Sequence, residues 1–343
     1  MRKLGSLIAA LALAGAAGVA AADWQALPDK APAPADNPTT PEKVELGKIL
    51  YHDPRLSSSG TVACASCHNV FAGGDDNRGG SVGVGAQVGG RSAPTVWNAA
   101  FNGTQFWDGR APSLEAQAKG PVTNPIEMGI KHWDEVVARL KSIPGYAPLF
   151  GQAFSGADPI TADNAAKAIA AYERTLITPN SAYDKFAKGD KSALTEQQQR
   201  GLNTFAEVGC VACHSGPVFN GQSGQGAGVY FKFPSTDNPA LEEQYGFSKD
   251  VGRFEVTKSE ADKHFYKVPT LRNIALTAPY FHNGKVKTLE EAVKIMAKLQ
   301  LDKELSPAQT ADITAFLNAL TGEFPKQEFP RLPGYPGKTF DFN

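Results

Sequence analysis

Two short segments of the chain combine two cysteines and a histidine with the same spacing. The pattern Cys-x-x-Cys-His occurs at 64–68 and again at 210–214, and together the copies use all 4 cysteines of the 343 residues. In this spacing both thiols can form thioethers to one porphyrin, and the following histidine can be an axial ligand of its iron. The residues concerned are Cys64, Cys67, His68, Cys210, Cys213 and His214. The sequence therefore predicts two covalently bound haem c groups.

Three other uses of the cysteines remain open on spacing alone. A disulfide framework is typical of short chains that are dense in cysteine, and this chain is long and poor in it. A structural zinc site built from two Cys-x-x-Cys pairs would leave the two equally placed histidines unexplained. A thioredoxin-like redox pair needs a strand-turn-helix setting that the flanking sequence does not provide. Covalent haem is the hypothesis that uses all six residues.

The N-terminus has the pattern of a secretory signal peptide. Basic Arg2 and Lys3 precede an apolar, Ala-rich run that ends in small residues at Ala20 and Ala22. We expect cleavage near Ala22 and a periplasmic protein, the alternative being an N-terminal anchor. No later segment is apolar enough to predict a stable membrane span. Removal of residues 1–22 takes the formal charge from -1 to -3, which gives no reason to expect nucleic acid as a partner.

An internal repeat becomes visible when each residue is aligned with the one 175 positions later. The segment 93–98 then falls on 268–273, and 106–110 falls on 281–285, without a gap. Trp107 occupies the place of His282 in this register. Both copies follow a haem motif, which predicts a duplicated haem domain.

The elements expected around these motifs are helices. Thr40 before Pro41, and Thr195 with Gln198, have the pattern of helix N-termini directly upstream of the two motifs. Further helices are expected over 161–176, 289–299 and 306–320. The predicted fold is all-α, with two cytochrome c-like haem domains related by internal duplication. The expected divisions are a signal peptide at 1–22, an N-terminal domain at 23–180, a C-terminal domain at 181–323 and a tail at 324–343.

Several further features bear on the chemistry of each haem. The segments 72–90 and 216–228 are rich in glycine, and the first is a candidate mobile gate beside a haem. The segment 23–37, rich in Ala and Pro, is expected to be a surface arm. A methionine as second axial ligand raises the potential of a haem, whereas an open position lets a small molecule react. Met296 and Met128 are the methionines that remain after Met1 is removed, and Met296 is the candidate ligand of the second haem.

The chain resembles the bacterial di-haem cytochrome c peroxidase family. The resemblance rests on the two haem motifs and on the segments 91–95, 106–110, 117–121 and 269–284, and covers nearly the whole mature chain. It implies a peroxidatic haem on His68 and an electron-accepting haem on His214. The implied substrate is hydrogen peroxide, the implied electron donor is a small c-type cytochrome or cupredoxin, and the implied assembly is a homodimer.

The resemblance also implies roles for individual residues. Glu127 and Gln117 would be the catalytic pair beside the open iron, where a carboxylate could move a proton between the two peroxide oxygens. Trp107 would lie between the haems, and His282 beside the C-terminal haem with its ligand Met296. A calcium ion between the domains is also implied. It would use the backbone oxygens of Thr277 and Pro279 and a contribution from Ser92.

Two positions depart from the family pattern. Many members carry a histidine in the first Gly-rich loop that ligates the peroxidatic iron of the oxidised enzyme, and this chain has Val84 there. Because valine cannot ligate iron, we expect an iron that is five-coordinate or water-bound and an enzyme that needs no reductive activation. Ser92 stands where the family usually has an asparagine near calcium, which predicts an altered affinity for the ion.

Two alternative functions stay open. A related di-haem oxidase modifies a protein tryptophan, but that family has a tyrosine where Met296 would ligate. A non-enzymatic di-haem electron carrier would need both irons saturated. The histidines that could supply another nitrogen are His52, His132, His264 and His282, and none lies in the first loop.

Overall fold

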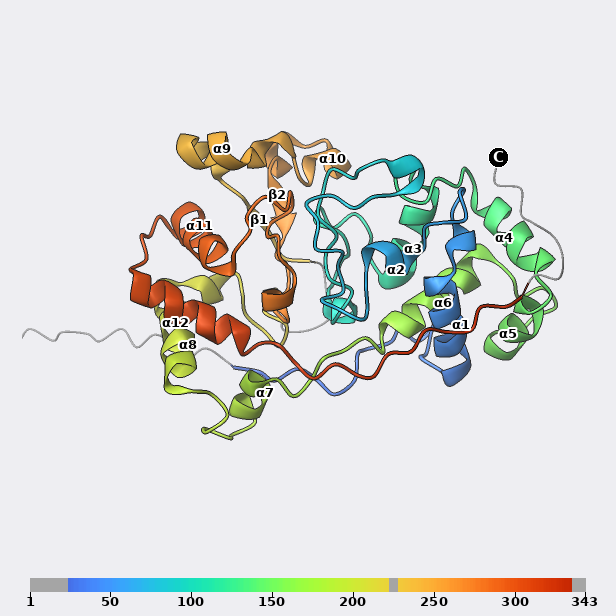
Figure 1. Ribbon diagram of the computed structural model, residues 1–343, viewed down its shortest axis with the longest axis horizontal. Helices are drawn as coiled ribbons and strands as arrows, with labels where there is room; N and C mark the ends of the chain where they lie inside the picture. Colours follow the sequence, from blue (N-terminus) through green and yellow to red (C-terminus); the bar gives the residue numbers. More distant parts are fainter. Residues whose placement is uncertain (1–23, 222–227, 335–343) are drawn as a thin grey trace, which may run out of the picture.

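The computed structural model describes residues 24–221 and 228–334, so the predicted signal peptide lies outside the described residues. Two helical halves lie side by side along the long axis of the molecule (Figure 1). The first half contains α1 (Pro41–His52), α2 (Cys64–Cys67), α3 (Leu114–Thr123), α4 (Trp133–Ser142), α5 (Tyr146–Ala153) and α6 (Ala162–Glu173). The second contains α7 (Ala182–Ala187), α8 (Glu196–Val208), α9 (Pro239–Tyr245), α10 (Phe254–Thr257), α11 (Leu289–Leu301) and α12 (Pro307–Asn318).

The predicted helix starts are confirmed. Thr40 caps α1 by accepting the backbone N–H of Lys43. Thr195 and Gln198 form the expected capping box at α8, which satisfies two amides that the helix itself leaves free. Helix α6 ends at Glu173 rather than at Leu176, because the chain tightens there into short-range turns such as Leu176 N–H to Glu173 O at 3.0 Å.

The strand content is small but not zero. Strands β1 (Tyr230–Lys232) and β2 (Phe265–Lys267) pair antiparallel in the second half, with Tyr230 opposite Lys267. The protein is therefore helix-rich with one small sheet in its described part, rather than purely α-helical. The expected junction between the domains also holds a short helix, α7, which Ser181 and Asp184 start with a capping box.

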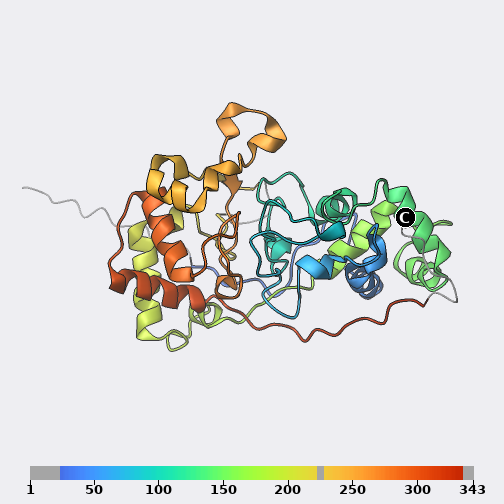
Figure 2. The ribbon, with the colours of Figure 1, turned by 45° about the horizontal axis from the view of Figure 1, so that its top comes forward.

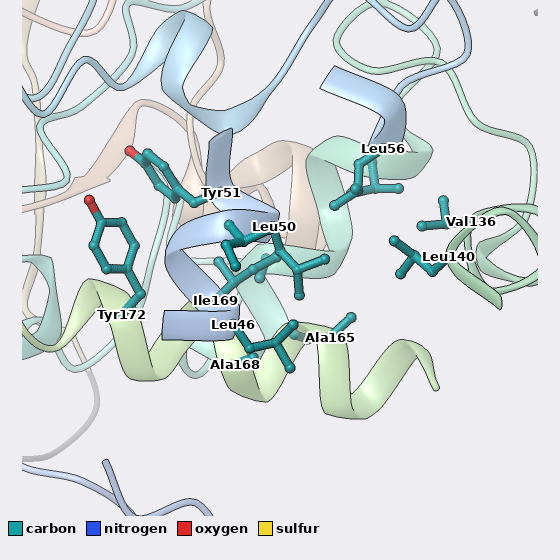
Figure 3. Packing of buried hydrophobic residues seen from close by; sticks show 14 of the residues in the cluster. Leu46, Leu50, Tyr51, Leu56, Val136, Leu140, Ala165, Ala168, Ile169 and Tyr172 are labelled. Carbon is teal, nitrogen blue, oxygen red and sulfur yellow. The ribbon is translucent and has the colours of Figure 1, made fainter. Parts of the chain in front are cut away.

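Each half has its own hydrophobic core, built on one pair of crossing helices. In the first half α1 packs on α6, and Leu46, Leu50 and Ile169 meet between them (Figure 3). In the second half α8 packs on α12. A glycine permits each crossing: a Cβ added to Gly47 would lie 1.9 Å from Ala168 O, and one added to Gly201 would lie 1.9 Å from Asp312 O. Both helix pairs can therefore approach closely enough for backbone contact.

The backbone repeats its unusual conformations at the spacing of 175 residues. Asn98 and Asn273 have φ values of 62° and 59°, and Phe106 and Phe281 have 70° and 68°. Isolated bridges join Gln105 to Ala111 in the first half and Tyr280 to Val286 in the second. These matched turns follow the two haem motifs at corresponding places, so the sequence repeat is also a repeat of local structure.

The two ends of the described chain cross over to the opposite half. Trp24 packs edge-to-face on Tyr183 of the second core, and the backbone N–H of Leu27 donates to Asp184 at 2.8 Å. The segment 324–334 runs back along the first half, as the dark red chain in Figure 2 shows, with Phe324 against Trp97. The expectation that residues 23–37 form a surface arm is therefore wrong for Trp24, which packs against the second core, and for Leu27, which is buried.

Candidate active site

The first haem motif lies at the end of a short helix that fixes its histidine. Helix α2 spans the two cysteines, and His68 is its C-cap residue. Tyr51 of α1 donates to His68 O at 2.7 Å, and His68 Nδ1 lies 2.9 Å from the carbonyl oxygen of Pro94. A ring held by Nδ1–H leaves Nε2 free as a ligand, which is the usual arrangement of a metal-binding histidine. Burial lowers the pKa of His68, which favours the neutral, ligating form.

A cavity of about 930 Å³ opens in front of this histidine. Its volume lies in the range of protein sites that bind cofactors and other small molecules. The predicted site residues that line it are Cys64, Cys67, His68, Ser92, Trp107, Gln117 and Glu127. Two thiols, one imidazole and a cavity with apolar walls are the donor set and space that a haem requires, so the residues fit this group.

Gln117 reaches the cavity from α3, and Glu127 reaches it from the turn that follows this helix. Gln117 lies one turn into α3, whose N-cap is Ser113. Glu127 lies beyond the end of the helix, where Asn124 Nδ2 donates to its Oε1 at 2.6 Å. Burial raises the pKa of Glu127, while the positive charge of Arg110 and the Asn124 hydrogen bond act in the opposite direction. A carboxyl whose pKa is subject to these opposing influences can accept and return a proton.

The first Gly-rich loop is packed against Glu127. Val84 is only 8% exposed and belongs to the first core, and its N–H donates to Glu127 O at 2.9 Å. Gln87 Nε2 donates to Val84 O and Pro125 O at 3.2 and 3.1 Å. Val84, at the position where a loop histidine would be expected, is therefore held beside Glu127 by hydrogen bonds of its backbone.

The second haem motif repeats the arrangement of the first. His214 is 8% exposed, and its Nδ1 lies 2.8 Å from the carbonyl oxygen of Phe219, which again leaves Nε2 free. Met296 is on α11 and packs, partly buried, against the second core. The second Gly-rich segment lies partly outside the described residues, at 222–227.

Trp107 and His282 lie at the boundary between the halves. Their rings meet edge-to-face with centroids 6.3 Å apart. His282 is 3% exposed and stacks on Tyr266, and its Nε2 lies 3.1 Å from Phe247 O. Trp107 Nε1 donates to Ser92 O at 2.9 Å. The structure thus brings these two predicted residues together.

The residues predicted to hold calcium also lie at this boundary. Ser92 donates its hydroxyl to Arg78 O at 2.8 Å. On the other side, Asn77 Nδ2 donates to Leu276 O and Ala278 O, which flank Thr277 and precede Pro279. Asp75 is 2% exposed, and its Oδ1 has no hydrogen-bond partner in the described part of the chain. Among the described residues no group of three or more His, Cys, Asp or Glu side chains is gathered for a metal ion. Oxygen donors from carbonyls with one orphaned carboxylate fit calcium, which prefers oxygen ligands.

An ion cluster at the mouth of the cavity was not predicted as part of the site. Arg91 binds Asp108 at 2.5 Å within its own half and Asp250 at 2.6 Å across the boundary. Arg91 and Asp108 lie in segments that carry the resemblance. Asp250 belongs to no motif, so the sequence held no signal that it would join them.

Comparisons with known proteins show the family to which the chain is related. A family model described as di-haem cytochrome c peroxidase matches residues 41–192. The chain is 46% identical to the cytochrome c551 peroxidase of Nitrosomonas europaea, over 94% of this chain and 91% of that protein. It is 46% identical to the cytochrome c551 peroxidase of Pseudomonas aeruginosa, over 92% and 88%. It is 47% identical to the cytochrome c peroxidase of Escherichia coli over 85% of this chain, but spans only 61% of that longer protein.

Solved structures share the fold. The crystal structure of a MauG-like protein associated with microbial copper homeostasis is 29% identical and superposes with a TM-score of 0.74, over 87% of this chain and 95% of that one. The fold and the site define a haem-containing oxidoreductase of the peroxidase class with two haem cofactors. The chain belongs to the di-haem cytochrome c peroxidase family. Within the described ranges, no helix is long and apolar enough to cross a membrane.

Proposed function

We propose that this protein reduces hydrogen peroxide to water with electrons from a small c-type cytochrome or a cupredoxin in the periplasm. The observation that carries the proposal is the shared cavity of His68, Gln117 and Glu127. His68, with its free Nε2, would hold the haem iron. The carboxyl of Glu127 and the amide of Gln117 would then form an acid–base site at the same haem.

The chain's own groups have distinct tasks in this proposal. A haem bound through His68, with covalent attachment to Cys64 and Cys67, would supply an open iron position for peroxide. Glu127 takes the proton from the nearer peroxide oxygen and returns it to the departing one. Gln117 orients peroxide by hydrogen bonding. The apolar residues in the cavity wall, such as Val62, Val96 and Ile169, lower the local dielectric, which strengthens both effects.

Electrons would enter through the second half. Cys210 and Cys213 are proposed to attach the other haem, with His214 and Met296 as its axial ligands. Trp107 and His282, in edge-to-face contact at the boundary, lie on the proposed route between the two haems. The separate cores and the repeated turns support two cytochrome c-like domains, 23–180 and 181–323, that arose by duplication.

A protein-modifying oxidase is the second candidate, because the chain is also 39% identical to the methylamine utilization protein MauG of Methylorubrum extorquens. Met296 as a ligand favours the peroxidase. A purely electron-carrying protein would need another ligand on the His68 iron, and Val84 packs where the family's loop histidine would be.

We also propose that the protein binds a calcium ion, forms a homodimer and is exported to the periplasm. Calcium would bind at the boundary through Thr277 and Pro279, with Ser92 nearby and Asp75 as an additional acidic ligand. The orphaned Oδ1 of Asp75 supports this, because a buried carboxylate oxygen needs a partner. Removal of calcium by a chelator should lower the thermal stability of the wild type and have less effect on Asp75→Asn. Equal effects on both proteins would exclude Asp75 from the site.

The decisive experiment is peroxide-dependent oxidation of a reduced small cytochrome c or cupredoxin by the holoprotein as isolated. Immediate turnover is the expected result. Turnover only after pre-reduction would keep the peroxidase and show that another residue ligates the His68 iron. No turnover with either donor, with or without pre-reduction, would contradict the proposed function.

A further inference from the structure

A second carboxyl lies in the wall of the His68 cavity. Glu173, the last residue of α6, is 5% exposed and lines the same cavity as Glu127. Its Oε2 atom is buried and has no hydrogen-bond partner in the parts of the chain that the structure describes. Buried polar atoms in folded proteins nearly always have a hydrogen-bond partner, so we expect the partner of this oxygen to lie within the cavity.

Among the described residues no cation forms an ion pair with Glu173, although the charge of the adjacent Arg174 acts to lower its pKa. The guanidinium of the adjacent Arg174 is engaged with another carboxylate, since its Nη2 lies 2.6 Å from Glu115 Oε1. Asn37 Nδ2 donates to the same Glu115 oxygen at 2.8 Å, which helps to hold Glu115 against Arg174. The charge of Glu115 also disfavours a second negative charge at Glu173.

The remaining titratable neighbours are uncharged at neutral pH. Tyr51 and Tyr172 interact electrostatically with Glu173, and each has a raised pKa that favours its neutral form. Cys64, which also lies near Glu173, carries no charge as the proposed thioether. An unpaired carboxylate in such surroundings is less stable than its neutral form. Burial, reinforced by Glu115 and only partly opposed by Arg174, raises the pKa of Glu173 to about 8.

We propose that Glu173 is a protonated carboxylic acid that stores a proton beside the peroxide site and releases it into the cavity during turnover. This inference rests on the proposed function. Reduction of peroxide follows H₂O₂ + 2 e⁻ + 2 H⁺ → 2 H₂O, and Glu127 only moves a proton that peroxide already carries. Both additional protons must come from solvent. Breaking the O–O bond needs neither of them, because both peroxide protons leave with the departing water. Glu173 donates one of the two additional protons afterwards, when the two electrons reduce the remaining oxygen to the second water, and solvent then reprotonates it. The electrons come from the donor protein.

Infrared difference spectroscopy tests whether the acid is neutral. The holoprotein should show a carboxylic acid C=O band near neutral pH that shifts on exchange into deuterium oxide. Glu173→Gln should lack this band, whereas Asp163→Asn, which removes an exposed carboxyl from the first turn of the same helix, should keep it. A spectrum unchanged by Glu173→Gln would overturn the proposal whether or not the enzyme is active.

A rapid-mixing experiment tests delivery of the proton. After the holoprotein has been mixed with peroxide, the rate at which it oxidises a reduced small cytochrome c should fall as the pH rises through about 8, because Glu173 loses its proton there. Glu173→Gln should oxidise the reduced cytochrome c at least about tenfold more slowly at neutral pH, and its rate should not fall around pH 8. Asp163→Asn should behave as wild type. A Glu173→Gln variant with the wild-type rate and pH profile would overturn proton delivery.

The remaining outcomes separate this proposal from the proposed function. A wild type that does not react with peroxide at all would overturn the proposed function and proton delivery together. Wild-type rates and pH profiles in both Glu173→Gln and Asp163→Asn would overturn proton delivery by Glu173 and leave the proposed function intact. If Glu173→Gln does not fold, Glu173→Asp replaces it, because this variant keeps the acid and should shift the pH at which the rate falls. A profile identical to wild type in Glu173→Asp would then count against the proposal.

Discussion

Trp107 and His282 occupy the same position of the internal repeat and face each other across the boundary, with ring centroids 6.3 Å apart and planes at 76°. The backbone around them is paired in the same reciprocal way. Ser92 N–H donates to His282 O at 2.8 Å, and Lys267, which is 175 positions after Ser92, donates its N–H to Trp107 O, also at 2.8 Å. The boundary is therefore a pseudo-symmetric contact, in which the two copies differ by placing an indole against an imidazole.

We expect Trp107→Phe to slow electron transfer between the halves. Phenylalanine keeps an aromatic ring but loses the indole N–H bond to Ser92 O and is harder to oxidise. Flash or rapid-mixing reduction of the second haem, followed by absorbance of the first, measures this rate. Trp133→Phe, which loses a similar bond to Lys119 O inside the first half, is the control. Equal rates in both variants would remove Trp107 from the route.

Glu127→Gln should lower kcat by about 10²- to 10⁴-fold while both haems stay attached. Glutamine keeps the shape of the side chain but cannot accept the peroxide proton. Because burial raises the pKa of Glu127, the wild-type rate should fall on the acid side at a higher pH than for an ordinary carboxyl. Steady-state assays over pH check both points. Glu135→Gln, an exposed residue of α4, should have no effect.

Val84→His should convert the peroxidatic haem of the oxidised protein from high-spin to six-coordinate low-spin. The variant should then require pre-reduction before it reacts with peroxide. Electron paramagnetic resonance of the oxidised protein reports the change, and wild type should show one high-spin haem. Val88→His, at a position of the same loop that is 64% exposed, is the control. Two low-spin haems in wild type would contradict the open-iron prediction.

Met296→Leu should lower the reduction potential of the second haem, because a thioether ligand stabilises the reduced iron. A shift on the order of 100 mV is reasonable against the ~0.8 V that axial ligands can span. Spectroelectrochemical titration measures it. Met128→Leu, which changes a methionine in the wall of the first cavity, should leave this potential in place. An unchanged potential in Met296→Leu would mean that another residue ligates the iron.

Gly47→Ala should destabilise the holoprotein by about 1–3 kcal/mol, because the added methyl group would overlap the backbone of α6. Urea denaturation followed by circular dichroism measures this difference. Gly151→Ala is the matched control, since it lies within α5 and its Cβ would meet nothing within 4 Å. Alanine there should be neutral or slightly stabilising, given its better helix propensity. A stable Gly47→Ala protein would mean that α1 and α6 can separate without cost.

Features that depend on short sequence patterns could be predicted without the structure. The haem motifs and the caps at Thr40 and Thr195 are patterns among neighbouring residues, and the repeat at 175 residues compares two such patterns, so local geometry follows from them. Contacts between distant segments became visible only in the folded chain. The tertiary structure anchored Trp24 in the opposite half and joined Asp250 to Arg91. It also buried Glu173 at a cavity wall without a partner. Burial and unpaired charge arise only when the chain has closed around a site, so no spacing along the sequence can encode them alone.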